Sequence, residues 1–170
     1  HTAAGATRRR FFLHDATGRS SKVPTARQVA ALVLETCAYI AGLIDGEGTI
    51  TLTREHRSES RRLVVSIANT ELALLDFVRR AVGAGRVTRK RVTSDAHTPS
   101  FAYRITSRQA VALLQQILPH LRSCKARRAQ LAVARYVAVT PRNGRYTAEL
   151  RAERCRFEEE FLGLCSRGNP

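Results

Sequence analysis

The chain has 170 residues, of which 44% are hydrophobic, and this is enough for one domain with a substantial core. Its formal net charge is +15, from 29 basic and 14 acidic residues, which favours nucleic acid as the partner and an anionic membrane only distantly. No apolar run approaches the ~20 residues of a membrane-spanning helix, so we expect no membrane partner. The four cysteines form no C-x-x-C pair, which is typical of reduced thiols in an intracellular protein.

The first 24 residues differ in composition from the rest, with three consecutive arginines at 8–10 and a single acidic residue. We interpret residues 1–24 as a basic amino-terminal arm and residues 25–170 as a single domain. Three readings of the arm stay open: a segment that follows a phosphate backbone, an Arg-rich organelle-targeting extension, or a tail without function. The compartment therefore stays open between an organelle (chloroplast or mitochondrion) and a bacterial cytoplasm.

The hydrophobic periodicity then predicts helices and strands in a regular order. A helix is expected over residues 25–35, with Thr25 as its N-cap, and it continues or restarts at Thr36 toward Gly46. Two strands, a helix, two strands and three further helices are expected in turn at 49–54, 63–67, 69–82, 86–93, 101–106, 107–118, 120–139 and 147–165. This alternation predicts an α+β protein.

Two of the expected strands carry many polar side chains. In residues 49–54, Ile50 and Leu52 alternate with three threonines, which predicts a strand with one buried face and one hydroxyl-rich face. Residues 86–93 carry four basic side chains, which suits contact with phosphates and grooves. A solvated edge strand protected by its charges is the alternative.

The stretch from Tyr39 to Ile50 combines small residues with two carboxylates. Gly42 and Gly46 lie four residues apart on one helix face, where missing side chains let another backbone approach. Asp45 and Glu47 fall at the expected helix C-terminus, where each charge opposes the helix dipole at a cost of ~0.3–1 kcal/mol. A divalent cation would offset this cost, because hard cations take carboxylate and carbonyl oxygens.

Residues 40–48 read I-A-G-L-I-D-G-E-G and closely resemble the L-A-G-L-I-D-A-D-G signature of the LAGLIDADG homing endonuclease family. The departures are Ile at 40, Gly at 46 and Glu at 47. The resemblance covers about residues 36–139 and implies an αββαββα fold with an antiparallel β-saddle and extra terminal helices. It implies a site-specific DNA endonuclease that depends on Mg²⁺ or another divalent cation. The alternative is a catalytically retired RNA-binding protein on the same fold, such as a group I intron maturase or a ribosome-associated factor.

The resemblance also implies roles for the two carboxylates. Glu47 matches the second acidic position of the signature and is the expected metal ligand. The backbone carbonyl of Gly46 or Gly48 is expected to complete the metal shell. Asp45 matches the first acidic position, which in the family caps and braces the paired helices.

Two further catalytic candidates follow from the resemblance alone. Asn69 falls where the family often places a polar residue that organises active-site water, although a plain helix N-cap is an equal alternative. Lys125 resembles the basic residue that the family directs toward the cleavage site. Arg122 and Arg127 are the alternatives for that role, because the local spacing is one residue longer than the expected form.

A single signature resembles the family members that pair as homodimers, which implies a pseudo-palindromic double-stranded DNA site. The implied interface is the signature helix, through Ile40, Gly42, Leu43 and Gly46. The two hairpins would form the DNA-binding saddle. The expected contacts with nucleic acid are Thr49, Thr51, Thr53, Arg54, Arg61, Arg62, Arg86, Thr88, Arg89, Lys90, Arg91 and Arg104.

Overall fold

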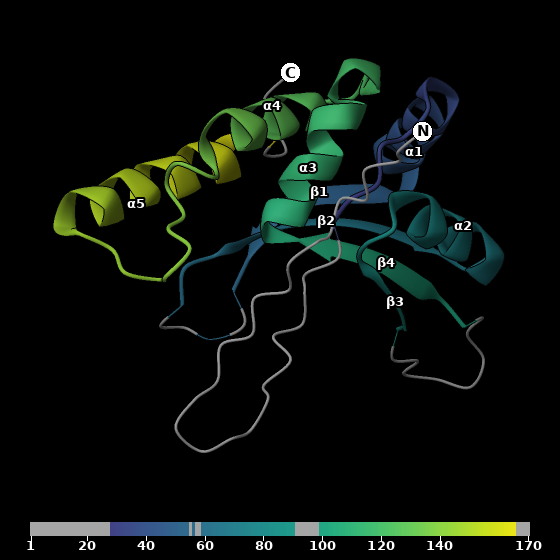
Figure 1. Ribbon diagram of the computed structural model, residues 1–170, viewed down its shortest axis with the longest axis horizontal. Helices are drawn as coiled ribbons and strands as arrows, with labels where there is room; N and C mark the ends of the chain where they lie inside the picture. The colour runs from purple at the N-terminus through teal and green to yellow at the C-terminus, as the bar shows by residue number, and fades with distance from the viewer. Residues whose placement is uncertain (1–27, 55, 57–58, 91–98, 166–170) are drawn as a thin grey trace, which may run out of the picture.

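The computed structural model describes residues 28–54, 56, 59–90 and 99–165, so the predicted arm at 1–24 lies outside the described residues. In the described part, one four-stranded sheet carries helices on a single face (Figure 1). The elements in chain order are α1 (Leu34–Glu47), β1 (Gly48–Thr53), β2 (Arg62–Asn69), α2 (Leu72–Val82), β3 (Arg86–Arg89), β4 (Phe101–Thr106), α3 (Ser107–Ile117), the 3-10 helix η1 (Leu118–His120), α4 (Lys125–Arg135) and α5 (Ala148–Gly163). The predicted αββαββα order and the additional terminal helices are confirmed.

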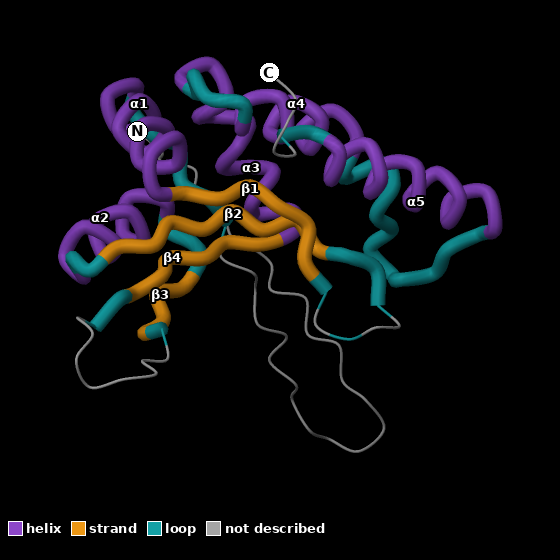
Figure 2. Tube along the Cα trace, turned by 180° about the vertical axis from the view of Figure 1, so that it is seen from behind, coloured by secondary structure: helices purple, strands orange, loops and turns teal. Residues whose placement is uncertain are grey.

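The sheet is antiparallel throughout, in the order β1-β2-β4-β3. Its strands twist and bend, and the helices gather above it while the opposite face carries no described helix (Figure 2). Side chains alternate between these two faces along each strand. The strand phase therefore decides which residues enter the core and which remain on the bare face.

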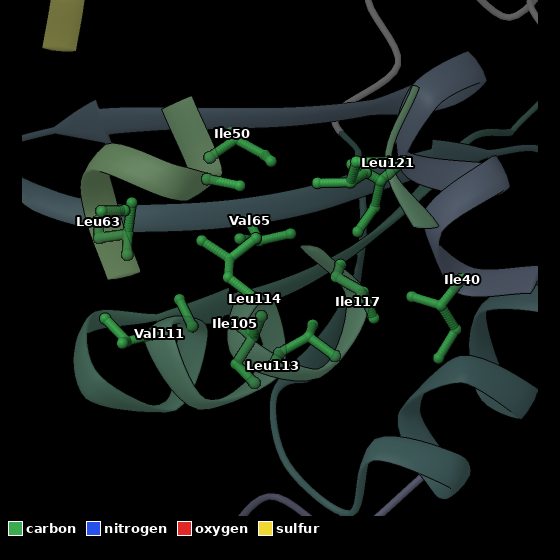
Figure 3. Close-up of a cluster of buried hydrophobic side chains, with 14 of the residues drawn as sticks. Ile40, Ile50, Leu63, Val65, Ile105, Val111, Leu113, Leu114, Ile117 and Leu121 are labelled. Carbon is green, nitrogen blue, oxygen red and sulfur yellow. The ribbon is translucent and has the colours of Figure 1, made fainter. Parts of the chain in front are cut away.

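The core lies between the sheet and the helices, as the close-up in Figure 3 shows. Ile50 from β1, Val65 from β2 and Leu114 from α3 are all at most 1% exposed. Burying each such side chain contributes about 1.5–3 kcal/mol. The inward face predicted for the 107–118 helix is confirmed, since Val111 and Ile117 are buried with Leu114. No helix of the described residues has the length and apolar character needed to cross a membrane.

The helix predicted over residues 25–35 is wrong in its described part, because residues 28–33 are not helical and α1 begins at Leu34. The backbone of this segment is bonded to other elements instead. The Ala30 N–H donates to the Val82 carbonyl at 2.9 Å, and the Leu32 N–H donates to Gln116 Oε1 at 2.8 Å. Gln116 Nε2 also donates to the Ala30 carbonyl at 3.0 Å. These tertiary bonds replace the local bonds of a helix.

Two further boundaries differ from the sequence prediction. Helix α2 begins at Leu72, whose side chain is 43% exposed, and its inward face starts at Leu75. It ends at Gly83, which has a left-handed φ of 70°. Strand β3 ends at Arg89, four residues earlier than predicted, and residues 91–98 lie outside the described part.

Candidate nucleic-acid interface and carboxylate site

Helix α1 passes directly into strand β1 at Gly48, and this sharp junction requires glycine. A Cβ atom at Gly48 would lie 2.5 Å from the Ile44 Cα and 2.8 Å from its carbonyl oxygen. The Gly48 N–H donates to that same carbonyl. The junction therefore fixes Glu47 as the last residue of the helix, beside the first residue of the sheet.

Asp45 ties this helix end to the segment that precedes α4. Its carboxylate accepts from the backbone N–H of Arg122 at 2.7 Å, from the Ser123 N–H at 3.2 Å and from Ser123 Oγ at 2.5 Å. Partial burial raises the pKa of Asp45, but the bonds from Ser123 and Arg122 and the charge of Lys125 outweigh it, so that pKa lies below its ordinary value. The acceptors of Asp45 are thus used within one chain. Ser123 was missed in the sequence, where only its place before a helix marks it.

Lys125 occupies the same helix end from the other side. Its Nζ donates to the carbonyls of Ile44 at 2.8 Å and Asp45 at 2.9 Å, which places a positive charge at the negative end of the α1 dipole. Arg122 and Arg127 are exposed and line a separate pocket beside Cys124. Of the three basic candidates, Lys125 is the one whose side chain bonds to the α1–β1 junction.

Glu47 is exposed, and it forms no hydrogen bond or ion pair with any other described residue. It lines an open pocket together with Asn69 and Ser100. Asn69 Oδ1 accepts from the Glu71 N–H at 2.8 Å, which orients the amide in the turn before α2. The structure therefore brings all four predicted catalytic residues to one end of α1, and among them Glu47 has no bonding partner within the described part of the chain.

The bare face of the sheet carries the predicted polar side chains of the first strand. Ile50 and Leu52 are buried toward the helices, so Thr49, Thr51 and Thr53 point to the bare face as predicted. Cross-strand pairing places four more of the predicted contacts on that face. These are Arg62, Arg86, Thr88 and Arg104.

Arg86 and Arg104 lie directly opposite each other on β3 and β4. With Arg62 they line a cavity of about 340 Å³ that also reaches Gln109 on the first turn of α3. Arg104 Nη2 donates to Thr53 Oγ1 at 3.1 Å, and its buried Nε has no hydrogen-bond partner in the described part of the structure. Like charges directly opposite each other are destabilising. The cavity is thus suited to an anion.

Several other predicted contacts are placed differently. Arg89 pairs with Phe101 and shares the phase of Val87, so its side chain lies on the helix side of the sheet, and its prediction as a bare-face contact is wrong. The Arg61 Nε lies 3.4 Å from Glu158 Oε2 and Arg54 Nη2 lies 3.9 Å from the same atom, which draws both toward α5. Lys90 is exposed just after β3, and Arg91 lies outside the described residues.

The predicted interface residues divide between two faces of α1. Ile40 is fully buried in the chain's own core (Figure 3), so its assignment to a surface between subunits is wrong. Leu43 is half-buried and packs against the core. Gly42 and Gly46 are exposed, and a Cβ at either position would meet no atom within 4 Å. Nothing in the described part of this chain therefore requires glycine at these two positions.

An αββαββα domain with a polar, basic bare sheet face and an exposed carboxylate at the α1–β1 junction has the homing-endonuclease fold. The family model of the LAGLIDADG-like domain matches residues 35–118. This stretch of the chain is therefore a LAGLIDADG-like domain. No curated protein matches the chain.

Solved structures of homing endonucleases share this fold. The homing endonuclease I-CvuI in complex with its target in the presence of calcium is 19% identical, with a TM-score of 0.62 over 79% of this chain and 84% of that one. The archaeal intron-encoded homing endonuclease I-Vdi141I, complexed with DNA, is 16% identical, with a TM-score of 0.60 over 79% and 87%. I-SmaMI bound to cleaved DNA is 17% identical at a TM-score of 0.55, and the chain spans 50% of its length.

Proposed function

We propose that this protein is a divalent-metal-dependent DNA endonuclease that acts as a homodimer on a pseudo-palindromic site. The observation that carries the proposal is Glu47, an exposed carboxylate without a described partner at the edge of a basic sheet face. A domain that only bound nucleic acid would gain nothing from this charge, because a carboxylate repels phosphates. DNA in the complexes of I-CvuI and I-Vdi141I supports duplex DNA as the ligand of that face.

The donor set of one chain fits part of a metal site. Among the described residues, no three of the His, Cys, Asp and Glu side chains gather closely enough to hold a metal ion. Glu47 offers a carboxylate that no other described residue bonds, whereas Asp45 and the carbonyl of Ile44 are already bonded. We infer that Glu47 and the Gly46 carbonyl of each of two paired chains would hold Mg²⁺ or a similar hard cation. When bound, the cation would activate water and stabilise the negative charge that develops on the phosphate.

The chain's own residues would prepare this chemistry. Asp45 and Lys125 fix the end of α1 through five hydrogen bonds, so Glu47 is held in place by the backbone rather than by its side chain. Asn69 would orient a water or a phosphate oxygen in the pocket that it shares with Glu47. Arg62, Arg86 and Arg104 would hold the DNA backbone or guanine edges along the bare face.

The pairing surface would be the exposed face of α1. Ala38, Gly42 and Gly46 lie four residues apart and are all exposed, which gives a flat strip along the helix. A second copy packed on this strip would approach closely and bring its own Glu47 near the first. Leu43 borders the strip from the half-buried side.

The test of catalysis begins with a duplex that the wild-type protein selects from a random pool. With Mg²⁺, the wild type is expected to cleave it, while Glu47→Gln binds it with unchanged affinity and does not cleave. Glu159→Gln is the matched control, because Glu159 is exposed on α5, far along the chain from the site. Wild-type protein that binds RNA tightly and cleaves no DNA would instead establish the RNA-binding alternative.

The test of pairing uses Gly42→Leu, since the chain itself leaves room for the larger side chain. The variant is expected to fold normally but to sediment as a monomer and to lose cleavage. Gly163→Leu is the control, because Gly163 on α5 is equally open. A Gly42→Leu protein that remains dimeric would show that α1 is not the interface.

A further inference from the structure

A second basic cavity borders the bare sheet face at Arg62, between the β1–β2 hairpin and α5. The chain from α4 to α5 descends beside the hairpin in both views (Figures 1 and 2). The cleft between them has a volume of about 680 Å³. Six arginines and two glutamates line it, together with hydroxyl groups of Ser60, Thr140 and Tyr146. We name it the hairpin–α5 cleft.

The floor of this cleft brings three arginines to one glutamate, Glu158. Arg154 is only 3% exposed, and its Nε donates to Glu158 Oε1 at 3.0 Å. The same glutamate also serves Arg61 at 3.4 Å and Arg54 at 3.9 Å. Three guanidinium groups therefore gather around the carboxylate of Glu158, in a site where partial desolvation strengthens electrostatic interactions.

Arg154 is held firmly as part of this floor. Its Nη1 donates to Thr140 Oγ1 at 2.6 Å and its Nη2 to the Arg61 carbonyl. Its guanidinium carbon lies 5.0 Å from the Tyr136 ring centroid and 5.3 Å from that of Phe157. The charge is thus pre-organised by packing and hydrogen bonds.

The rim adds two exposed arginines. Arg142 lies in the segment between α4 and α5, and Arg151 lies on the first turns of α5. Neither forms an ion pair with another residue of the described ranges. A guanidinium group presents a planar fork of donors that matches phosphate oxygens. The cleft therefore combines the fixed guanidinium group of Arg154 with the exposed guanidinium groups of Arg142 and Arg151, and this arrangement suits a phosphate group.

The position of the cleft indicates where such a phosphate would belong. Strand β1 leads from Glu47 to Arg54, and its six residues span about 20 Å at ~3.3 Å each. That distance corresponds to about six base pairs at ~3.4 Å per step. The cleft lies at the end of this strand, and its rim residues follow residue 118, where the LAGLIDADG-like match ends.

We propose that the hairpin–α5 cleft binds a backbone phosphate of duplex DNA beyond the segment that the sheet covers. The proposal rests on the proposed DNA-binding function and extends its footprint at each end of the site. Arg142 and Arg151 would grip the phosphate, while Arg154 and Glu158 hold the floor. In a homodimer, the two clefts would contact symmetric outer positions.

The test compares two double variants that remove the same charge. Arg142→Ala with Arg151→Ala changes the rim, whereas Arg145→Ala with Arg156→Ala changes exposed arginines on the same segment and helix that do not line the cleft. The probe is the duplex that the wild-type protein selects from a random pool. Each phosphate contact contributes about 0.9 to the slope of log affinity against log salt, so the rim variant, which loses one phosphate contact, is expected to lose about 0.9 from this slope per chain. Ethylation of the outermost phosphates should interfere with binding by the wild type only.

The outcomes separate this inference from the proposed function. Wild-type protein that selects no duplex removes the proposed function and the cleft proposal with it. Two results overturn the cleft proposal alone, provided that the wild type selects a duplex. One is an equal slope of log affinity against log salt for both double variants. The other is ethylation interference at the outermost phosphates that is the same for the rim variant as for the wild type. In another outcome, inorganic phosphate stabilises the wild type against unfolding but not the rim variant, while both proteins bind DNA equally. That outcome would assign the cleft to a small anion and would also overturn the cleft proposal.

Discussion

The two places where a helix meets the β1–β2 hairpin differ in how they balance charge. At the α1–β1 junction, Asp45 accepts three hydrogen bonds and Lys125 donates two, whereas Glu47 has no bonding partner among the residues that the structure describes. At the hairpin–α5 cleft, Glu158 is shared by three arginines, and two more stand on the rim. The first junction keeps a surplus of negative charge, and the second keeps a surplus of positive charge.

This difference separates residues that serve the fold from residues that serve a ligand. Some residue types are required by contacts within the chain itself, as at Gly48 and Arg154, where other atoms pack or bond around the residue. At Gly46 and Glu47, by contrast, no contact with another described residue requires the residue type, and both residues are exposed. The first kind is expected to change stability when it is replaced, and the second is expected to change binding or cleavage.

Arg154→Met is expected to give the largest change in stability. It removes the arginine that lies closest to Glu158, whose side chain is only 14% exposed. The charge of Glu158 is then balanced only by the more distant Arg61 and Arg54 among these three arginines. Breaking a buried ion pair from one side costs about 3–5 kcal/mol. Urea unfolding followed by circular dichroism measures this loss. Arg151→Met on the exposed side of α5 is the control and should change the free energy of unfolding by less than ~0.5 kcal/mol.

Gly48→Ala and Gly46→Ala are expected to act in opposite directions although they lie two residues apart. A methyl group at 48 would meet the Ile44 backbone at 2.5 Å, and such overpacking costs about 1–3 kcal/mol. A methyl group at 46 meets nothing within the chain, and alanine favours a helix over glycine by up to ~1 kcal/mol. Urea unfolding of both variants at low protein concentration tests this difference. Equal destabilisation by both would show that Gly46 also has a role within the chain.

The strand phase of β1 was predictable because one face of the sheet is buried. Ile50 and Leu52 must lie toward the core, and this alone sends the three threonines to the bare face. Arg89 was placed on the wrong face because the strand contains one apolar residue, Val87, before it ends at Arg89. A single apolar residue fixes the strand phase only once its pairing with Tyr103 is known. The basic strand therefore had too little apolar pattern to show its phase.

Long-range bonds account for the remaining failures. Residues 28–33 have the composition of a helix, but their backbone groups bond to α2 and to Gln116, which the local sequence does not reveal. Arg154 lies among charged residues of α5 and gives no sign in the sequence that it is buried. The sequence placed Asp45 and Glu47 at a helix end, where α1 does end, yet only the structure distinguishes the bonded Asp45 from Glu47, which bonds to no other described residue.

Asp45→Asn sharpens the contrast between these two carboxylates. Because the pKa of Asp45 is lowered in the folded protein, its ionised form contributes stability that is complete above the ordinary value of 3.8 and is lost as pH falls through the lowered pKa. At neutral pH the variant is expected to lose about 1 kcal/mol, since the charged hydrogen bonds are partly open to solvent. The difference from wild type should shrink below about pH 4. Asp76→Asn, which removes an exposed (i, i+3) pair, is the control and should cost less than ~0.5 kcal/mol.

Glu47→Gln is expected to give the smallest change in stability and the largest change in chemistry. Since Glu47 has no described partner to lose, the free energy of unfolding should stay within ~0.5 kcal/mol of wild type. Cleavage of the selected duplex in Mg²⁺ should fall by about 100-fold or more, because even residues behind a metal ligand commonly contribute 10–100-fold. A variant that unfolds more easily by over ~1 kcal/mol would place Glu47 among the residues that serve the fold, like Asp45 beside it. Measured together, unfolding and cleavage thus decide whether the surplus negative charge at the α1–β1 junction is kept for a cation.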